Sequence, residues 1–232
     1  MPPAPLLRPF VTANFALTWD AKVSTKNRSP ANFSSPRDKR RLLEIRSEAD
    51  AILVGATTIG TDHMSMGLPA ADLRARRVAA GKSEYPQRVI LSNSGRLDPG
   101  LEVFKNRDSP LHIFSTTRMP KRLRATLPAT LDLEAGSRVD LHRMLSVLRN
   151  TYGIQRLLCE GGPTVLRALL SADLLDELHL TFCPRIFGGK KALTLTGQPG
   201  VFFPVSTALR LSDMEVVDDE CFLRYRVVRP NP

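Results

Sequence analysis

An acidic residue, two glycines and a proline interrupt two apolar runs at 159–164, which reads CEGGPT. Proline at 163 suits the first position of a helix, because its missing N–H is not needed there, and Gly162 then falls at the N-cap. Bare glycine backbone beside a helix N-terminus admits an anion, since free N–H groups and the helix dipole favour negative charge. The segment fits a phosphate site and also an ordinary strand-to-helix turn, and the spacing alone does not choose between them.

Strand and helix patterns alternate around this segment. Short apolar runs at 10–19, 51–55, 88–92, 111–115 and 156–159 are typical of strands, the middle ones buried on both faces as in a parallel sheet. A helix is predicted over 36–49, with Ser35 as N-cap, Pro36 in first position and Asp38 in the third. Weaker helical patterns cover 72–80, 116–127 and 140–152. Polar loops at 24–35 and 61–73 lie near strand carboxyl ends, where open parallel sheets bind ligands.

The C-terminal part is expected to be richer in strands. A run at 177–189 precedes a predicted hairpin of 209–217 and 221–228, turning at Asp218 and Asp219. The chain is therefore predicted to be one α/β domain over 1–232, with a frayed start at 1–8. Its sheet should be mixed but mostly parallel, flanked by helices and completed by antiparallel C-terminal strands.

Composition narrows the class of partner. The net charge of +10 favours an anionic small molecule or phosphate-bearing cofactor. Nucleic acid is disfavoured, because aromatics are only 6% and do not alternate with basic residues. The three cysteines are dispersed and no secretory pattern precedes them, which predicts reduced thiols in the cytoplasm. No run is long enough to span a membrane, and no histidine or cysteine spacing predicts a metal site.

A resemblance joins these features. The stretch at 157–189, LLCEGGPTVLRALLSADLLDELHLTFCPRIFGG, resembles the C-terminal signature of the riboflavin-biosynthesis reductase family, the reductase half of bifunctional pyrimidine deaminase/reductases. Further blocks agree in order, at 8–23, 42–62, 88–99 and 222–226. That family has the three-layer fold of dihydrofolate reductase, so the resemblance implies the same fold here.

The resemblance also implies an activity. Members reduce the ribose of a phosphoribosylamino-pyrimidine to a ribityl chain with hydride from NADPH, so the expected enzyme is of the 5-amino-6-(5-phosphoribosylamino)uracil reductase type. The zinc signature of the deaminase half, H-x-E with P-C-x-x-C, does not occur in the sequence, which predicts a stand-alone reductase. Family members pair through sheet or C-terminal segments, so the resemblance implies a homodimer.

By resemblance, the cofactor lies against three segments. These would supply Thr57, Thr58, Ser92, Asn93, Ser94, Arg96, Gly161, Gly162, Pro163 and Thr164. The family meets the adenosine 2′-phosphate after the third strand, where Arg96 would add a charge-assisted contact. NADPH is therefore expected rather than NADH.

Substrate contacts carried over are Lys22, Arg46, Asp62 and Glu160, and three of these, Lys22, Asp62 and Glu160, are candidate catalytic residues. Glu160 would orient the substrate or relay a proton to the opening ribose oxygen. Each also has a plainer interpretation. Lys22 fits a surface lysine, Glu160 fits an ion-pair partner for an arginine, and Arg46 fits a solvated charge on a helix face apart from Leu42 and Ala49.

Two departures leave the substrate open. The family often has Asp-Asp-Pro-x-Leu-x-x-Arg after the second strand, but 61–69 reads TDHMSMGLP, and its Asp-Gly-Lys is here Asp20-Ala21-Lys22. The alternatives are a reductase of a related pteridine, folate-like or other heterocyclic compound on the same fold, and a non-enzymatic protein that binds nucleotides or nucleic acid.

Overall fold

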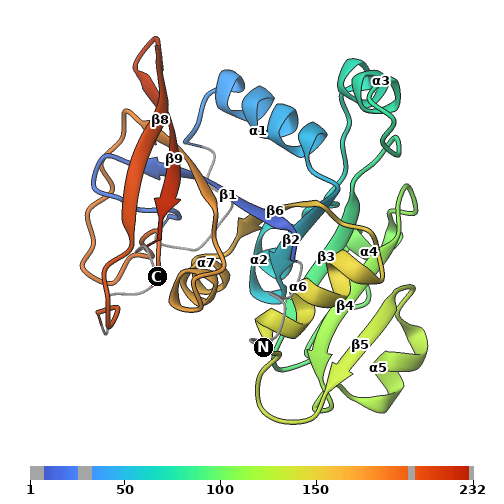
Figure 1. The fold of residues 1–232 in the computed structure, drawn as a ribbon. Helices are drawn as coiled ribbons and strands as arrows, with labels where there is room; N and C mark the ends of the chain where they lie inside the picture. The colour runs from blue at the N-terminus through green and yellow to red at the C-terminus, as the bar shows by residue number, and fades with distance from the viewer. Residues whose placement is uncertain (1–7, 26–32, 198–201, 230–232) are drawn as a thin grey trace, which may run out of the picture.

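Nine strands form one sheet in the computed structural model, which describes residues 8–25, 33–197 and 202–229 (Figure 1). All but the last residue of the expected frayed start, and most of the 24–35 loop, lie outside the described residues. The strands are β1 (Phe10–Thr18), β2 (Ala51–Gly55), β3 (Gln87–Ser92), β4 (Leu111–Thr116), β5 (Thr130–Glu134), β6 (Arg156–Gly161), β7 (Glu177–Cys183), β8 (Ala208–Val217) and β9 (Glu220–Val228). The helices are α1 (Pro36–Glu48), α2 (Ala56–Asp62), α3 (Ala71–Ala79), α4 (Glu102–Lys105), α5 (Lys121–Thr126), α6 (Leu141–Asn150) and α7 (Pro163–Ser171).

The sheet is mostly parallel, as predicted. Its order is β5-β4-β3-β2-β6-β1-β7-β9-β8, and every neighbouring pair from β5 to β7 is parallel. Only the C-terminal hairpin differs, because β9 runs antiparallel to both β7 and β8. The sheet that was expected from the short apolar runs and the C-terminal hairpin is confirmed.

Each face of the sheet carries its own apolar core. On one face, strand residues such as Leu53 and Leu157 pack with the apolar sides of α6 and α7. On the other, residues such as Ile52 and Ile90 pack with α2 and α4. Alternate side chains of a strand point to opposite faces, so β2 contributes Leu53 to the first core and Ile52 to the second. The result is a three-layer arrangement of helices, sheet and helices.

Helix α1 begins as the sequence predicts. Ser35 is its N-cap and accepts a hydrogen bond from the Asp38 N–H at 3.1 Å, and Pro36 occupies the first turn. Helix α5 starts only after Pro120, so the helix expected over 116–127 is shortened at its beginning. No helix in the described part of the chain is long and apolar enough to cross a membrane.

Two elements differ from the expectation. Helix α2 follows β2 directly and includes Thr61 and Asp62, which were expected in a loop. Its sequence, ATTIGTD, contains three threonines and a glycine, which have weak helix propensity, and no side chain of the described residues caps its start. Strand β5 was also not predicted, because a short edge strand with charged residues lacks the apolar run of the central strands.

The edge strand β8 has an apolar stripe on one face. Its register with β9 shifts by one residue between Leu211 and Asp213, as at a β-bulge. Residues directly opposite each other on paired strands point to the same face of the sheet. The apolar residues of β8 lie opposite every second residue of β9, so all of them stay on one face despite the shift. The stripe consists of Leu209, Leu211, Met214 and Val216, which are 40–60% exposed.

Candidate active site

A cavity of about 820 Å³ opens where β2, β3 and β6 end and extends along the middle of β1. Most of the residues singled out from the sequence line it, namely Arg46, Thr57, Thr58, Asp62, Ser92, Asn93, Ser94, Glu160, Gly162, Pro163 and Thr164. Lys22, Arg96 and Gly161 are not among the lining residues. The carboxyl ends of the parallel strands therefore gather three distant segments into one site, as such sheets generally do.

The glycine segment forms one wall of the cavity. Gly161 has a φ of +124°, a conformation that side chains rarely adopt, and Gly162 is the N-cap of α7. A Cβ on Gly162 would lie 2.5 Å from Thr58 Oγ1, so any other residue there would displace the Thr58 side chain. No side chain in the described residues caps α7, and its positive end lies at the cavity. This wall fits a phosphate group held by main chain.

The end of β3 forms the next part of the rim through residues that are already hydrogen-bonded. Ser92 Oγ accepts from the Gly95 N–H at 3.1 Å, and Asn93 Oδ1 accepts from the Val139 N–H at 2.9 Å. These bonds fix the turn, leaving Ser94 exposed at the rim. Arg96 is exposed as well but lies outside the lining, so its role as a phosphate contact stays a prediction.

A buried ion pair forms another part of the cavity lining. Arg46 Nε donates to Glu160 Oε1 at 2.5 Å and Arg46 Nη2 donates to Oε2 at 2.6 Å, while Nη1 donates to the Gly67 carbonyl at 2.8 Å. The two side chains are only 10% and 5% exposed. Burial lowers the pKa of Arg46, but the Glu160 charge and hydrogen bonds outweigh it, so the net pKa is raised.

The position of Arg46 corrects the expectation from the sequence. Arg46 was placed on a different helix face from Leu42, yet both line the cavity together with Asp38. Residues four apart on an α-helix lie on the same face, so Asp38, Leu42 and Arg46 form one ridge. The solvated helix charge is therefore wrong for Arg46, whereas the ion-pair interpretation of Glu160 is confirmed.

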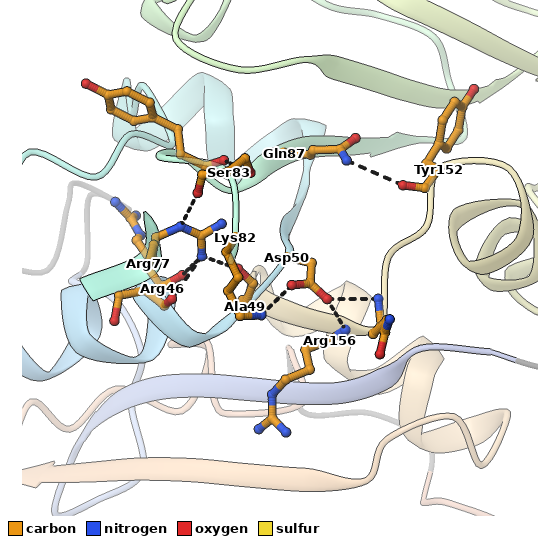
Figure 2. A network of polar contacts seen from close by, with 12 residues as sticks. Arg46, Ala49, Asp50, Arg77, Lys82, Ser83, Gln87, Tyr152 and Arg156 are labelled. Atoms are coloured by element: carbon orange, nitrogen blue, oxygen red, sulfur yellow. Dashed lines mark hydrogen bonds and ion pairs between the residues drawn. The ribbon is translucent and has the colours of Figure 1, made fainter. Parts of the chain in front are cut away.

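The residue that anchors the C-terminal end of α1 was not predicted from the sequence. Figure 2 shows Arg77 of α3 reaching this end, where Nη1 donates to the carbonyls of Ala49 at 2.5 Å and Ser47 at 2.9 Å. Arg77 is 2% exposed, although it lies in a basic stretch, RARR at 74–77. Orphan carbonyls at a helix end need such partners. Arg77 thus fixes the turn of α1 that carries Arg46.

The carboxylate of Asp50 stabilises the same region at the end of α1. Asp50, between α1 and β2, accepts from Lys82 Nζ at 2.5 Å and from the main-chain N–H groups of Gln155 and Arg156 at 2.9 Å each (Figure 2). Burial raises the pKa of Asp50, but these donors more than offset it and the net pKa is lowered. The carboxylate therefore joins the start of β2 to the start of β6.

The Asp-Ala-Lys segment shapes a loop beside the cavity. Asp20 accepts from Thr18 Oγ1 and from the N–H groups of Phe187 and Gly188, and these hydrogen bonds, that from Thr18 first, lower its pKa to about 2. Ala21 has a φ of +58°, which favours glycine and explains why the resembled family has glycine there. Lys22 pairs its main chain with Thr194, so the structure places it beside the cavity wall and not in it.

Asp62 lies at the cavity where α2 ends, and the loop that follows is packed into the core. The Asp62 side chain is exposed there and accepts a hydrogen bond from Thr61 Oγ1 at 3.0 Å, and partial desolvation by the surrounding protein raises its pKa. Met66 and Leu68, each 1% exposed, anchor the loop in the core. The loop that departs from the family pattern is thus packed against the protein, and it also supplies the carbonyl that Arg46 binds.

The chain is similar to proteins that are named as pyrimidinone phosphate reductases. The chain is 34% identical over 196 residues to the 2,5-diamino-6-ribosylamino-4(3H)-pyrimidinone 5′-phosphate reductase of Methanothermobacter thermautotrophicus, covering 84% of this chain and 87% of that one. It is 30% identical to the enzyme of the same name from Archaeoglobus fulgidus, covering 82% and 86%.

Solved structures agree on the fold. A pyrimidine reductase-like protein of Corynebacterium diphtheriae superposes with a TM-score of 0.83 at 22% identity, covering 96% of this chain and 93% of that one. The riboflavin biosynthesis reductase of Saccharomyces cerevisiae gives a TM-score of 0.67 at 22% identity, covering 95% and 90%. The model of the family described as RibD C-terminal domain matches residues 9–223, and the chain belongs to this family.

Proposed function

We propose that this protein is an NADPH-dependent reductase that converts the ribose of a ribosylamino-pyrimidine phosphate to a ribityl chain. The observation that carries the proposal is the cavity, which combines a main-chain phosphate cradle at Gly162 with a polar wall at Glu160. The relatives that share 30% or more of their sequence are named as reductases of a 2,5-diamino-pyrimidinone, so that ring is favoured over the uracil ring. The three cysteines are free thiols, which fits a cytoplasmic protein.

The proposed reaction opens the ribose ring and transfers one proton and one hydride. The ribose ring opens when the C1′–O4′ bond breaks, O4′ takes a proton, and a C=N bond forms between C1′ and the amino nitrogen. A nicotinamide cofactor, when bound, supplies the hydride that C1′ accepts. The residues of the cavity must therefore hold the sugar with C1′ toward the glycine wall and deliver a proton at O4′.

Residue roles follow from the geometry. The Glu160 carboxylate is paired with the Arg46 guanidinium through two hydrogen bonds. We therefore propose that the pair positions the substrate, and we give Glu160 no separate role as an acid. Asp62 also lines the cavity, and its raised pKa suits a proton donor. Lys22 would reach the substrate phosphate from the rim. NADPH is preferred over NADH because Ser92, Asn93 and Ser94 offer polar groups where a 2′-phosphate would lie.

The activity itself is directly testable. With the 2,5-diamino-6-ribosylamino-pyrimidinone 5′-phosphate as substrate, we expect NADPH oxidation at 340 nm and a ribityl product by mass spectrometry. NADH should support a kcat/KM at least about tenfold lower, which corresponds to losing one charge-assisted phosphate contact. Turnover of a pteridine or folate compound, with none of the pyrimidinone, would contradict the proposal.

The glycine wall gives a second prediction. Gly162→Ala should raise the Kd of NADPH about tenfold or more, because its Cβ would displace Thr58 from the cavity wall. Gly60→Ala in α2 is the matched control, since a Cβ there meets nothing within 4 Å, and it should leave the Kd unchanged. Fluorescence titration with NADPH measures both. Equal affinities for the two variants would remove Gly162 from the cofactor site.

The ion pair gives a third prediction. Glu160→Gln leaves the Arg46 charge buried without its partner, so the free energy of unfolding in urea should fall by about 3–5 kcal/mol. The exposed pair of Lys105 and Glu102 supplies the control, because Glu102→Gln should change stability by less than about 0.5 kcal/mol.

A double variant separates stability from catalysis. Replacing Arg46 and Glu160 together by methionine should restore stability to within about 1 kcal/mol of wild type, since neither charge is then stranded. Turnover should stay at least about 100-fold low, because the polar wall is gone. Recovery of turnover along with stability would show that the pair serves folding alone.

We also propose a homodimer built on β8. Its stripe of Leu209, Leu211, Met214 and Val216 extends the apolar face of the sheet, where Leu223 and Tyr225 of β9 pack against the core. An exposed apolar edge strand invites pairing with another strand, and a second copy offers an identical stripe.

The dimer gives a fourth prediction. Light scattering should report twice the chain mass of 25.7 kDa for the wild type, and Met214→Lys with Val216→Lys should halve it. Arg210→Glu, on the opposite face of the same strand, should leave the dimer intact. A wild-type monomer at tens of micromolar would refute the assignment.

A further inference from the structure

The ridge of α1 has two ends that differ in how well their polar groups are satisfied. Asp38 and Arg46 are eight residues apart, about 12 Å along a helix, and both line the cavity. Arg46 finds full partners in Glu160 and Gly67. At the other end, Asp38 is 7% exposed and its Oδ1 has no hydrogen-bond partner among the described residues.

Two further polar atoms beside this end are also unsatisfied. Asn14 Oδ1 and Thr181 Oγ1 are buried without partners in the described part of the chain. Thr181 is opposite Ala16 in the register of β1 and β7, so its side chain shares a face with Asn14, two residues along β1. That face is the one that α1 covers, because Asn14, Asp38 and Arg46 line the same cavity. Buried unpaired groups are costly, which points to a bound partner.

Helix capping does not account for Asp38. An acid in the third helical position usually accepts the N–H of the N-cap residue. Here the Ser35 N–H donates to Glu220 Oε1 at 2.9 Å, and Ser35 Oγ donates to Glu220 Oε2 at 2.5 Å. Glu220 has taken over that task, so the Asp38 carboxyl is left facing the cavity.

The groups around Asp38 leave its carboxyl without enough hydrogen-bond donors. Burial raises the pKa of Asp38, and the nearby hydroxyls of Thr181 and Ser34 oppose this effect only in part. The charge of Glu220 raises the pKa further, whereas the charge of Arg41 lowers it. Thr181 lies close enough to affect this pKa but makes no hydrogen bond of normal geometry. A ligand that brings N–H groups would satisfy Asp38 and Asn14 together, since both present acceptor oxygens.

We propose that Asp38 and Asn14 recognise the N–H-rich edge of the pyrimidine ring and select a substrate that still carries its 2-amino group. The inference rests on the proposed function. A 2-amino group and the adjacent N3–H present two donors, which match acceptor oxygens. A ring with a carbonyl at position 2 would set an acceptor against an acceptor.

The test compares two substrates in one enzyme. For wild type, kcat/KM with the 2,5-diamino-pyrimidinone should exceed that with the 5-amino-uracil analogue by about tenfold or more. Asp38→Asn presents an amide N–H₂ to position 2, so the ratio should fall about 10- to 100-fold, with NADPH affinity unchanged. Glu44→Gln is the matched carboxyl-to-amide control on α1 outside the cavity lining, and it should leave the ratio as in wild type.

Asn14→Leu provides a second variant of similar size. It removes the other acceptor and should lower the same ratio about tenfold. If wild type turns over the diamino substrate but the ratio survives in both variants, the assignment of Asp38 and Asn14 is wrong while the proposed function stands. If the wild-type enzyme reduces neither substrate, the proposed function and the assignment of Asp38 and Asn14 are both wrong. A soluble, folded Asn14→Leu enzyme decides the question even if Asp38→Asn does not fold.

Discussion

The buried pair of Arg46 and Glu160 is the interaction on which the site depends. It joins α1 to β6, and through the Gly67 carbonyl it also joins the loop after α2, so three segments that enclose the cavity meet at one guanidinium. Removing one member of such a pair strands a buried charge, at a cost of about 3–5 kcal/mol. The pair fixes where the polar wall of the cavity stands relative to the glycine wall.

The rest of the architecture serves that arrangement. Arg77 holds the C-terminal carbonyls of α1, and Asp50 holds the starts of β2 and β6, so the helix and strands that carry the pair are fixed from outside the cavity. Gly162 forms another wall, where the absence of a Cβ leaves room for Thr58. The polar atoms at the Asp38 end lack partners within the described chain. Rigid walls around an unsatisfied interior are what a selective binding site requires.

Local patterns in the sequence were sufficient to predict the helices and strands that carry the site residues. Ser35 and Pro36 mark the start of α1, Gly162 and Pro163 mark the start of α7, and apolar runs mark the central strands. Tertiary contacts lay beyond reach. Arg77 is an ordinary basic residue until α3 packs against α1, and Asp38 is an ordinary capping acid until Glu220, far along the chain, takes its place. The four-residue spacing already placed Arg46 on the same helix face as Leu42, and only its partner Glu160, 114 residues away, could not be predicted.

The central claim is hydride transfer from NADPH to C1′ of the substrate sugar. It is tested most directly with NADPH deuterated at the transferable C4 position, the 2,5-diamino-6-ribosylamino-pyrimidinone 5′-phosphate, and NMR of the product. We expect one deuterium at C1′ of the ribityl chain, with none at that carbon when the deuterium is supplied in the solvent. A reduced product whose C1′ hydrogen comes from solvent, or a deuterium on the pyrimidine ring, would contradict it.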